Sequence, residues 1–156
     1  MLFRSISASE QKERLDYVLR ELGLQKLRAS TAHTLSGGER RRTEIARALV
    51  TRPRFMLLDE PFSGVDPKAV EELQVIIGHL RDQGIGILIT DHSVRETLTV
   101  TNRSYVVSQG KVLASGNAEE LVNHPMVRQV YLGEKFYMQF DESLASSMPE
   151  NHPKRD

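Results

Sequence analysis

The spacing of apolar residues over the first fifty positions predicts two helices. Ser7 and Glu10 have the spacing of a capping box, and they precede apolar residues at positions 15, 18, 19 and 22 that share one helical face. Gly23 is expected to end this helix. The stretch TLSGGERRRTEIARAL, residues 34–49, predicts a second helix that begins at two glycines and runs to about Val50.

Two short apolar runs farther along predict strands. Residues 55–58 and 85–90 show no alternation of apolar and polar positions, which is typical of strands buried on both faces of a parallel sheet. A helix is expected between them, with Asp66 as its N-cap, Pro67 at its first position and Gly84 at its end.

The remaining elements are shorter. We expect a helix over 93–100, a hairpin over 104–116 that turns at Gln109 and Gly110, and short helices over 118–125 and 127–133. Helices that alternate with buried strands favour an α/β fold, in which helices flank a parallel sheet. Residues 137–156 lose this periodicity, and we expect them to form a flexible tail.

Composition and charge narrow the class of protein. The 156 residues are enough for one ordinary domain. Lysine plus arginine and aspartate plus glutamate both number 21, so no net field favours nucleic acid or an anionic membrane as a partner. There is no cysteine, which excludes disulfides, thiolate metal sites and a cysteine nucleophile. No apolar stretch approaches the roughly 18 residues of a spanning helix, so we expect any membrane connection to be peripheral, through a partner.

Two acids, Asp59 and Glu60, follow the first predicted strand directly. Ligands of open α/β sheets bind at the carboxyl ends of the strands. Adjacent strand residues point to opposite sides, so one acid can hold Mg²⁺ while the other accepts a proton from an attacking water. The alternative is a solvated acidic turn, which is common at the end of a strand.

His92 follows the second predicted strand in the same way, and it is therefore expected at the same sheet edge, near the two acids. An imidazole there can donate a hydrogen bond to a terminal phosphate oxygen. A single histidine in a turn is more often structural or merely exposed. The position that it shares with the acids is what favours a functional role.

The glycines of the second helix require an explanation, because a glycine within a helix costs about 1 kcal/mol. The start of a helix is an anion site with free amides and a positive dipole end, to which Ser36 adds a hydroxyl donor. Gly37 and Gly38 would let a phosphate approach the backbone. Alternatively, Ser36 only caps the helix and the arginines lie on a solvated face. Arg41 and Arg42 are expected to face acids or a partner rather than a ligand.

Four motifs in order resemble one family, the ATP-binding subunits of ABC transporters. LSGGE (35–39) resembles the signature motif, FMLLDEP (55–61) the Walker B strand with its catalytic glutamate, SGVD (63–66) the D-loop and TDHS (90–93) the switch-histidine loop. The resemblance implies a partial P-loop NTPase fold over residues 1–136. Part of the helical subdomain would lie at about 7–50, and the core, with a C-terminal β-hairpin, at about 51–136.

The resemblance also implies ATP and Mg²⁺ as ligands, a homodimer as the working form, and a role for each motif residue. The signature residues would bind ATP held by the opposite subunit, and these are Ser36, Gly37, Gly38 and Glu39. Asp59 would serve Mg²⁺, Glu60 would polarise the attacking water, and His92 would contact the γ-phosphate. Asp66 would lie at the dimer seam. On this interpretation Gly37 and Gly38 are bare because a nucleotide bound by the other subunit docks on them.

Within the family, longer stretches such as LLDEPFSGVDP and GILITDHSVRETL resemble the branch that powers lipopolysaccharide export. This implies transmembrane permease subunits as partners, no nucleic acid, and a place on the cytoplasmic face of the inner membrane. A P-loop, G-x-x-x-x-G-K-[ST], does not occur in the sequence: around Gly110 and Lys111, Tyr105 replaces the first glycine and Val112 replaces the serine or threonine. We therefore expect a C-terminal portion of such a subunit, inactive in isolation.

Two other functions remain open. A soluble ABC-family ATPase of translation or DNA repair would keep the same motifs, but heptad arms, a tandem copy and a basic linker are not seen in this sequence. A non-enzymatic module without a P-loop could instead offer its signature helix to an intact ABC ATPase.

Overall fold

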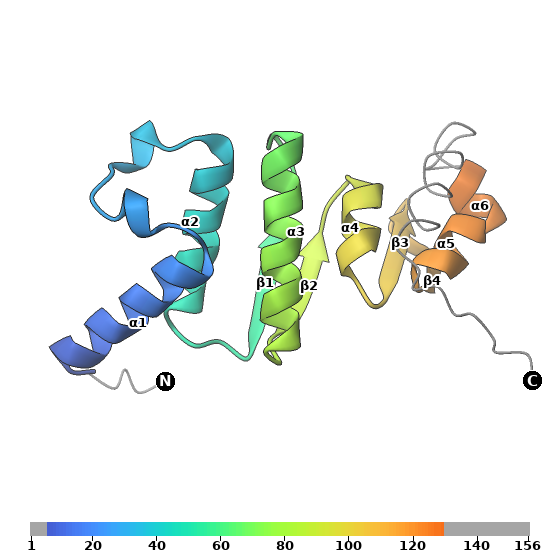
Figure 1. Ribbon diagram of the computed structural model, residues 1–156. Helices are drawn as coiled ribbons and strands as arrows, with labels where there is room; N and C mark the ends of the chain where they lie inside the picture. Colours follow the sequence, from blue (N-terminus) through green and yellow to red (C-terminus); the bar gives the residue numbers. More distant parts are fainter. Residues whose placement is uncertain (1–5, 130–156) are drawn as a thin grey trace, which may run out of the picture. The chain divides into compact units, whose positions relative to one another are not determined.

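The computed structural model describes residues 6–129, and the chain divides after Val100 into two compact units. Figure 1 follows the elements along the chain. The first unit contains four α-helices, two short 3-10 helices and two strands. In chain order these are α1 (Ala8–Glu21), η1 (Gln25–Leu27), η2 (Ala32–Thr34), α2 (Gly37–Leu49), β1 (Phe55–Asp59), α3 (Pro67–Asp82), β2 (Gly86–Thr90) and α4 (Val94–Val100). The division at residue 50, between subdomains of a larger domain, stays a prediction.

Helix α1 begins and ends where the sequence predicts, but its details differ. The Ser7 hydroxyl accepts a hydrogen bond from the Glu10 amide at 3.2 Å, while the Glu10 carboxylate pairs with Arg14 at 2.5 Å. The carboxylate is therefore turned toward Arg14, and the predicted capping box is only half formed. Gly23 follows the helix with φ of 64°, a conformation that glycine adopts without strain. Leu15, predicted to lie on the apolar face, is exposed, so the core-facing stripe is narrower than expected.

The strands β1 and β2 pair in parallel, from Phe55 opposite Gly86 to Asp59 opposite Thr90. This parallel register brings the carboxyl ends of both strands to the same edge of the sheet. The parallel pairing confirms the predicted sheet type. Figure 1 shows α3 running alongside the two strands, in front of them in this view.

One face of this two-stranded sheet is covered and the other is open. Met56 is 4% exposed and belongs to the same core as Leu73, Ile77 and Leu80 of α3. Its neighbours Phe55 and Leu57 are each 77% exposed, and Leu88 of β2 is 59% exposed. Alternate strand residues point to opposite faces, and the helices of the described residues cover only one of them. The prediction of strands buried on both faces is therefore wrong for the part of the chain that the structure describes.

The second unit is built on a hairpin. Strands β3 (Ser104–Ser108) and β4 (Lys111–Gly116) pair antiparallel, and both turn residues have positive φ, 50° at Gln109 and 74° at Gly110. Two positive φ values are typical of the tight turns that match the twist of a hairpin, so the predicted turn is confirmed. Two short helices follow, α5 (Ala118–Asn123) and α6 (Pro125–Val127). Of the helix predicted over 127–133, only the first three residues, 127–129, lie within the described part of the chain. The predicted tail over 137–156 lies outside the described residues.

Candidate functional site at the carboxyl ends of two parallel strands

The ends of β1 and β2 bring together the acids and the histidine that the sequence singles out. Asp59 is opposite Thr90 in the register, and the Thr90 hydroxyl donates a hydrogen bond to Oδ1 of Asp59 at 2.5 Å. Asp59 is exposed, so its carboxylate is open to solvent. The next residue, Glu60, is directed to a different partner. The two adjacent acids thus have different neighbours, and their division of roles stays a prediction.

Glu60 and His92 face each other across the strand ends. Oε1 of Glu60 lies 3.7 Å from Nδ1 of His92, and their side chains are 56% and 69% exposed. This separation is longer than a hydrogen bond but within ion-pair range when the imidazole is protonated. A carboxylate and an imidazole therefore share one open surface. The predicted proximity of His92 to the acids is confirmed for Glu60.

Asp91 also lies at this edge, and the sequence pattern predicts no role for it. Its side chain is fully buried, with 0% exposure. Oδ2 accepts a hydrogen bond from the Phe62 amide at 2.9 Å, and Oδ1 accepts one from the Ser93 amide at 2.8 Å. The carboxylate thereby ties the loop after Glu60 to the loop that carries His92. The available signal was a second aspartate at a strand end, directly before the histidine.

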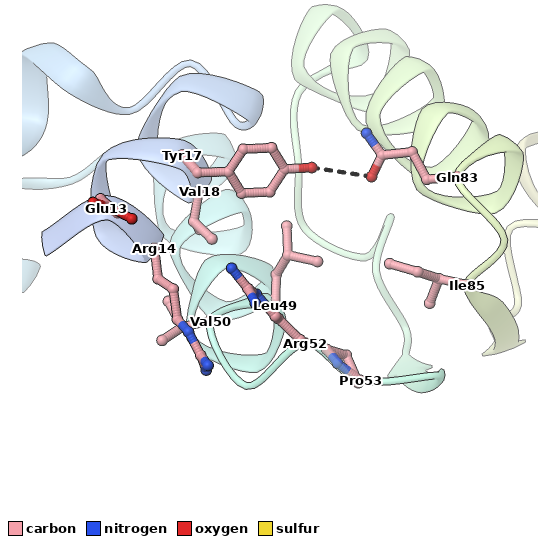
Figure 2. A pocket seen from close by; sticks show the side chains of 10 residues that line it. All are labelled: Glu13, Arg14, Tyr17, Val18, Leu49, Val50, Arg52, Pro53, Gln83 and Ile85. Carbon is pink, nitrogen blue, oxygen red and sulfur yellow. Dashed lines mark hydrogen bonds between the residues drawn. The ribbon is translucent and has the colours of Figure 1, made fainter. Parts of the chain in front are cut away.

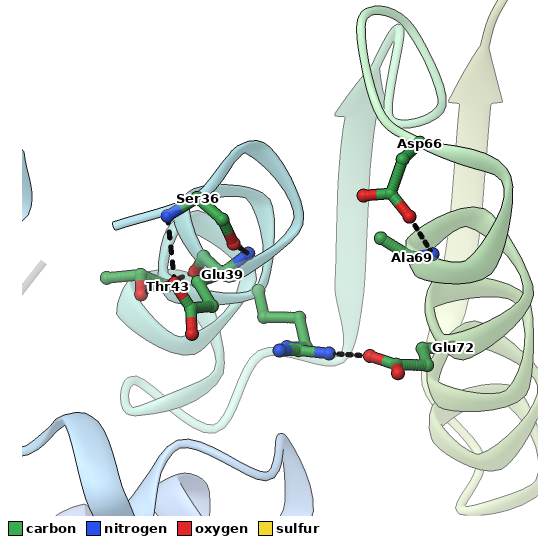
Figure 3. A network of polar contacts seen from close by, with 7 residues as sticks. Ser36, Glu39, Thr43, Asp66, Ala69 and Glu72 are labelled. Carbon is green, nitrogen blue, oxygen red and sulfur yellow. Dashed lines mark hydrogen bonds and ion pairs between the residues drawn. The ribbon is translucent and has the colours of Figure 1, made fainter. Parts of the chain in front are cut away.

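The start of α2 is capped by its own residues, as Figure 3 shows for Ser36 and Glu39. The Glu39 amide donates to the Ser36 hydroxyl at 3.3 Å, and the Ser36 amide donates to Oε2 of Glu39 at 2.8 Å. The hydrogen bonds from the Ser36 backbone and side chain lower the pKa of the Glu39 carboxyl. Two of the four signature residues predicted to bind nucleotide, Ser36 and Glu39, are therefore engaged in a capping box. Ser36 remains exposed at the helix start.

The two glycines of α2 have different surroundings. Gly37 is exposed, and the nearest atom that an added Cβ would meet is the Gly64 carbonyl oxygen at 3.5 Å, an ordinary contact. Gly38 is buried, and an added Cβ would lie 2.5 Å from Cβ of Ala69 in α3. The close approach of α2 to α3 accounts for Gly38 without any ligand. Only Gly37 presents bare backbone to solvent.

The arginines of α2 make contacts within the chain. Arg42 forms an ion pair with Glu72 of α3, and Arg41 pairs with Glu44 at 2.7 Å. The prediction that these two arginines face acids is confirmed. Asp66 caps α3 through a hydrogen bond from the Ala69 amide to its Oδ1 at 3.0 Å, as the sequence predicts (Figure 3). Its place at a dimer seam stays a prediction.

A pocket of about 500 Å³ lies elsewhere in the first unit, between α1, the end of α2 and the segment that follows α3. Figure 2 shows Tyr17 and Gln83 meeting across it, where the tyrosine hydroxyl donates to Oε1 of Gln83 at 3.2 Å. None of its ten lining residues is a predicted site residue. The candidate site is therefore the open surface at the strand ends and not this pocket.

Mg²⁺ has one suitable ligand at the strand ends. Among residues 6–129, no cluster of three or more histidine, aspartate or glutamate side chains is arranged to hold a metal ion. Mg²⁺ in phosphate-binding sites, however, is usually held by one or two carboxylates together with waters and phosphate oxygens. The exposed carboxylate of Asp59, with one oxygen already oriented by Thr90, fits that requirement.

Comparison with known proteins agrees with this geometry. The family model described as ABC transporter matches residues 2–63, which include the signature helix, β1 and both acids. An ATP-binding cassette of an ABC transporter, solved in its ADP conformation, superposes with a TM-score of 0.74 at 30% identity, covering 85% of this chain and 54% of that one. The chain belongs to the family of ABC transporter ATP-binding proteins.

Two curated relatives narrow the similarity within that family. The chain is 57% identical over 131 residues to the lipopolysaccharide export system ATP-binding protein LptB of Acidithiobacillus ferridurans. It is 53% identical over 131 residues to the protein of the same name from Escherichia coli. Each match covers 84% of this chain and 54% of the relative, so the chain spans about half the length of these proteins. In the part of the chain described by the structure, no helix is both long and apolar enough to cross a membrane.

Proposed function

We propose that this chain supplies the signature helix, the catalytic glutamate and the switch histidine of an ATP-hydrolysing subunit that powers lipopolysaccharide export. The observation that carries the proposal is the 3.7 Å separation of Glu60 and His92 at the carboxyl ends of two parallel strands, beside Asp59. The similarity to two LptB proteins of lipopolysaccharide export systems supports lipopolysaccharide as the transported substrate in this proposal.

In this proposal Glu60 is the general base. Its carboxylate is more than half exposed, so a water molecule can reach it. It accepts a proton from that water as the oxygen attacks the γ-phosphorus of ATP, while the bond from that phosphorus to the β–γ bridging oxygen breaks and ADP leaves. His92 lies within ion-pair range of the same carboxylate, and its imidazole donates a hydrogen bond to a γ-phosphate oxygen. The pair thus positions water and phosphate on one surface.

Asp59 is the residue that would hold Mg²⁺. The bound ion would neutralise negative charge on the phosphates. Thr90 fixes the rotation of the Asp59 carboxylate through its hydroxyl hydrogen bond, which leaves the second oxygen for the ion. Because Glu60 is directed to His92 instead, the two adjacent carboxylates do not compete for one ligand.

The start of α2 serves the ATP held by a second copy of the subunit. The exposed Gly37 amide and the Ser36 hydroxyl are donors at a helix start, where the dipole favours a phosphate. Glu39 orients Ser36 through the capping box, and Gly38 lets α2 lie close to α3. Asp66, the cap of α3, would lie at the seam between the copies.

The further partners are transmembrane permease subunits. The complex would lie on the cytoplasmic face of the inner membrane, with this subunit as a peripheral component. Nucleic acid is not a partner in this proposal, in keeping with the balanced 21 basic and 21 acidic residues.

A chimaera of the Escherichia coli relative tests the proposal, with its matched 131 residues replaced by those of this chain. The chimaera should hydrolyse ATP, and Glu60→Gln should lower kcat by roughly 10²–10⁴-fold while ATP binding is kept. Glu71→Gln, the loss of an exposed acid on α3, is the matched control and should stay near the unsubstituted rate. Full turnover by the Glu60→Gln form would overturn the catalytic assignment. The substrate is tested separately, by delivery of lipopolysaccharide to the surface of cells depleted of their own relative.

A further inference from the structure

The backbone of Glu60 has an unusual conformation. Its φ is 45°, in the left-handed region that residues other than glycine rarely occupy. The next residue, Pro61, is fully buried, and a residue before proline is normally driven toward extended conformations. Strain of this kind persists only where surrounding contacts enforce it. The contacts of the Glu60 backbone therefore decide where its carboxylate points.

Three hydrogen bonds hold this backbone. The Glu60 amide donates to the Thr90 carbonyl at 2.6 Å, and the Ser63 amide donates to the Glu60 carbonyl at 3.2 Å. The third donor is Nη2 of Arg41, which lies 2.7 Å from the same carbonyl. It is the shorter of the two bonds to that oxygen, and its donor is charged. Hydrogen bonds from ionised donors are about twice as strong as neutral ones.

The guanidinium of Arg41 is itself held in place. Its Nη1 donates to Oε2 of Glu44 at 2.7 Å, one turn farther along α2. An exposed pair of this spacing is worth little by itself. Here it orients the planar group so that the other amino nitrogen reaches the strand end, and the Arg41 side chain is only 25% exposed. A residue of the signature helix thereby contacts the backbone of the proposed base.

We propose that Arg41 is a positioning residue for Glu60. Its guanidinium stabilises the left-handed backbone through the Glu60 carbonyl and so keeps the carboxylate directed toward His92. The inference rests on the proposed function, since it assigns Arg41 a part in the turnover that Glu60 would catalyse. It also links the position of the base to α2, the helix proposed to meet the ATP of a second copy.

The test uses the same chimaera, with Arg41→Gln compared with Arg40→Gln. Arg40 is the neighbouring exposed arginine, and within the described residues its side chain makes no ion pair or hydrogen bond. Both changes therefore remove one charge from α2, but only Arg41→Gln removes a side-chain hydrogen bond. Arg41→Gln should lower kcat roughly tenfold, which corresponds to about 1.4 kcal/mol. The KM for ATP and the melting temperature should stay close to those of Arg40→Gln. Arg41→Lys keeps a charged donor but loses the planar guanidinium group, whose two amino nitrogens reach Glu44 and the Glu60 carbonyl. Its kcat should therefore lie between that of Arg41→Gln and that of the unsubstituted chimaera.

A second measurement examines the backbone directly, by amide hydrogen exchange in the 156-residue chain. Faster exchange at Ser63 in Arg41→Gln than in Arg40→Gln supports the contact, because the amide of Ser63 donates to the carbonyl that Arg41 holds. Equal exchange in the two variants overturns it.

The outcomes separate this inference from the proposed function. If the unsubstituted chimaera is active, Glu60→Gln is inactive, and Arg41→Gln has the same kcat as Arg40→Gln, then the inference on Arg41 is wrong and the proposed function stands. If the unsubstituted chimaera is inactive, or Glu60→Gln turns over normally, the proposed function fails and the catalytic role of Arg41 fails with it. A drop in kcat that Arg41→Lys partly restores, at unchanged KM, supports both.

Discussion

Replacing Gly38 by alanine should destabilise the protein, although alanine is the better helix former. The added Cβ would lie 2.5 Å from Cβ of Ala69, whereas ordinary contacts between such atoms are 3.4–4 Å. Neither methyl group can rotate away, so α2 and α3 must separate by about 1 Å. Overpacking of this kind costs roughly 1–3 kcal/mol, and the gain in helix propensity returns at most about 1 kcal/mol. From a cost near the middle of that range, about 2 kcal/mol, less a gain of up to about 1 kcal/mol, the expected net loss is about 1–2 kcal/mol.

Gly37→Ala is the matched control, because it makes the same chemical change one residue earlier. Its Cβ would have an ordinary contact, 3.5 Å from the Gly64 carbonyl oxygen. We expect its free energy of unfolding to stay within about 0.5 kcal/mol of the unsubstituted chain, as for a surface substitution. Urea unfolding of the 156-residue chain, followed by circular dichroism, compares the two variants.

Adding Ala69→Gly to Gly38→Ala should relieve the clash. The double variant should then be more stable than the sum of the two single changes by about 1–2 kcal/mol, a coupling expected only for residues in contact. If Gly38→Ala is as stable as Gly37→Ala, and Ala69→Gly shows no coupling, then the close approach of α2 to α3 is not the reason for Gly38.

Two further predictions concern buried and capping carboxylates. Asp91→Asn leaves one acceptor oxygen for two backbone amides, so it should lower the free energy of unfolding in urea by about 1–3 kcal/mol. The control Asp82→Asn changes an exposed carboxylate and should leave that free energy nearly unchanged. Equal losses of stability in the two variants would show that Asp91 does not bridge the two loops. The pKa of Glu39 is lowered in the fold, so its contribution to stability is present above the ordinary glutamate range and is lost as pH falls through the lowered pKa. The small stability difference between the unsubstituted chain and Glu39→Gln should therefore shrink between neutral pH and pH of about 3, and a difference that stays constant with pH would contradict the assignment.

The sequence alone determined the elements and the motifs that depend on neighbouring residues. The cap of α3 at Asp66 and the hairpin turn at Gln109 and Gly110 involve residues at most a few positions apart. Local spacing is therefore enough to predict them. The placement of Glu60 and His92 at one edge also followed, since parallel strands end together.

Tertiary structure alone decided the contacts between residues far apart in the chain. No spacing indicates that Arg41 reaches the carbonyl of Glu60, 19 positions away, or that Asp91 accepts from the Phe62 amide, 29 positions away. Position 38 requires glycine because the methyl group of Ala69 in α3 lies close to it, which no local pattern indicates. The apolar run of β1 likewise does not tell which faces of the sheet are covered by helices. These features depend on how closely helices and strands pack in three dimensions, and that distance is set by the whole core and not by any local pattern.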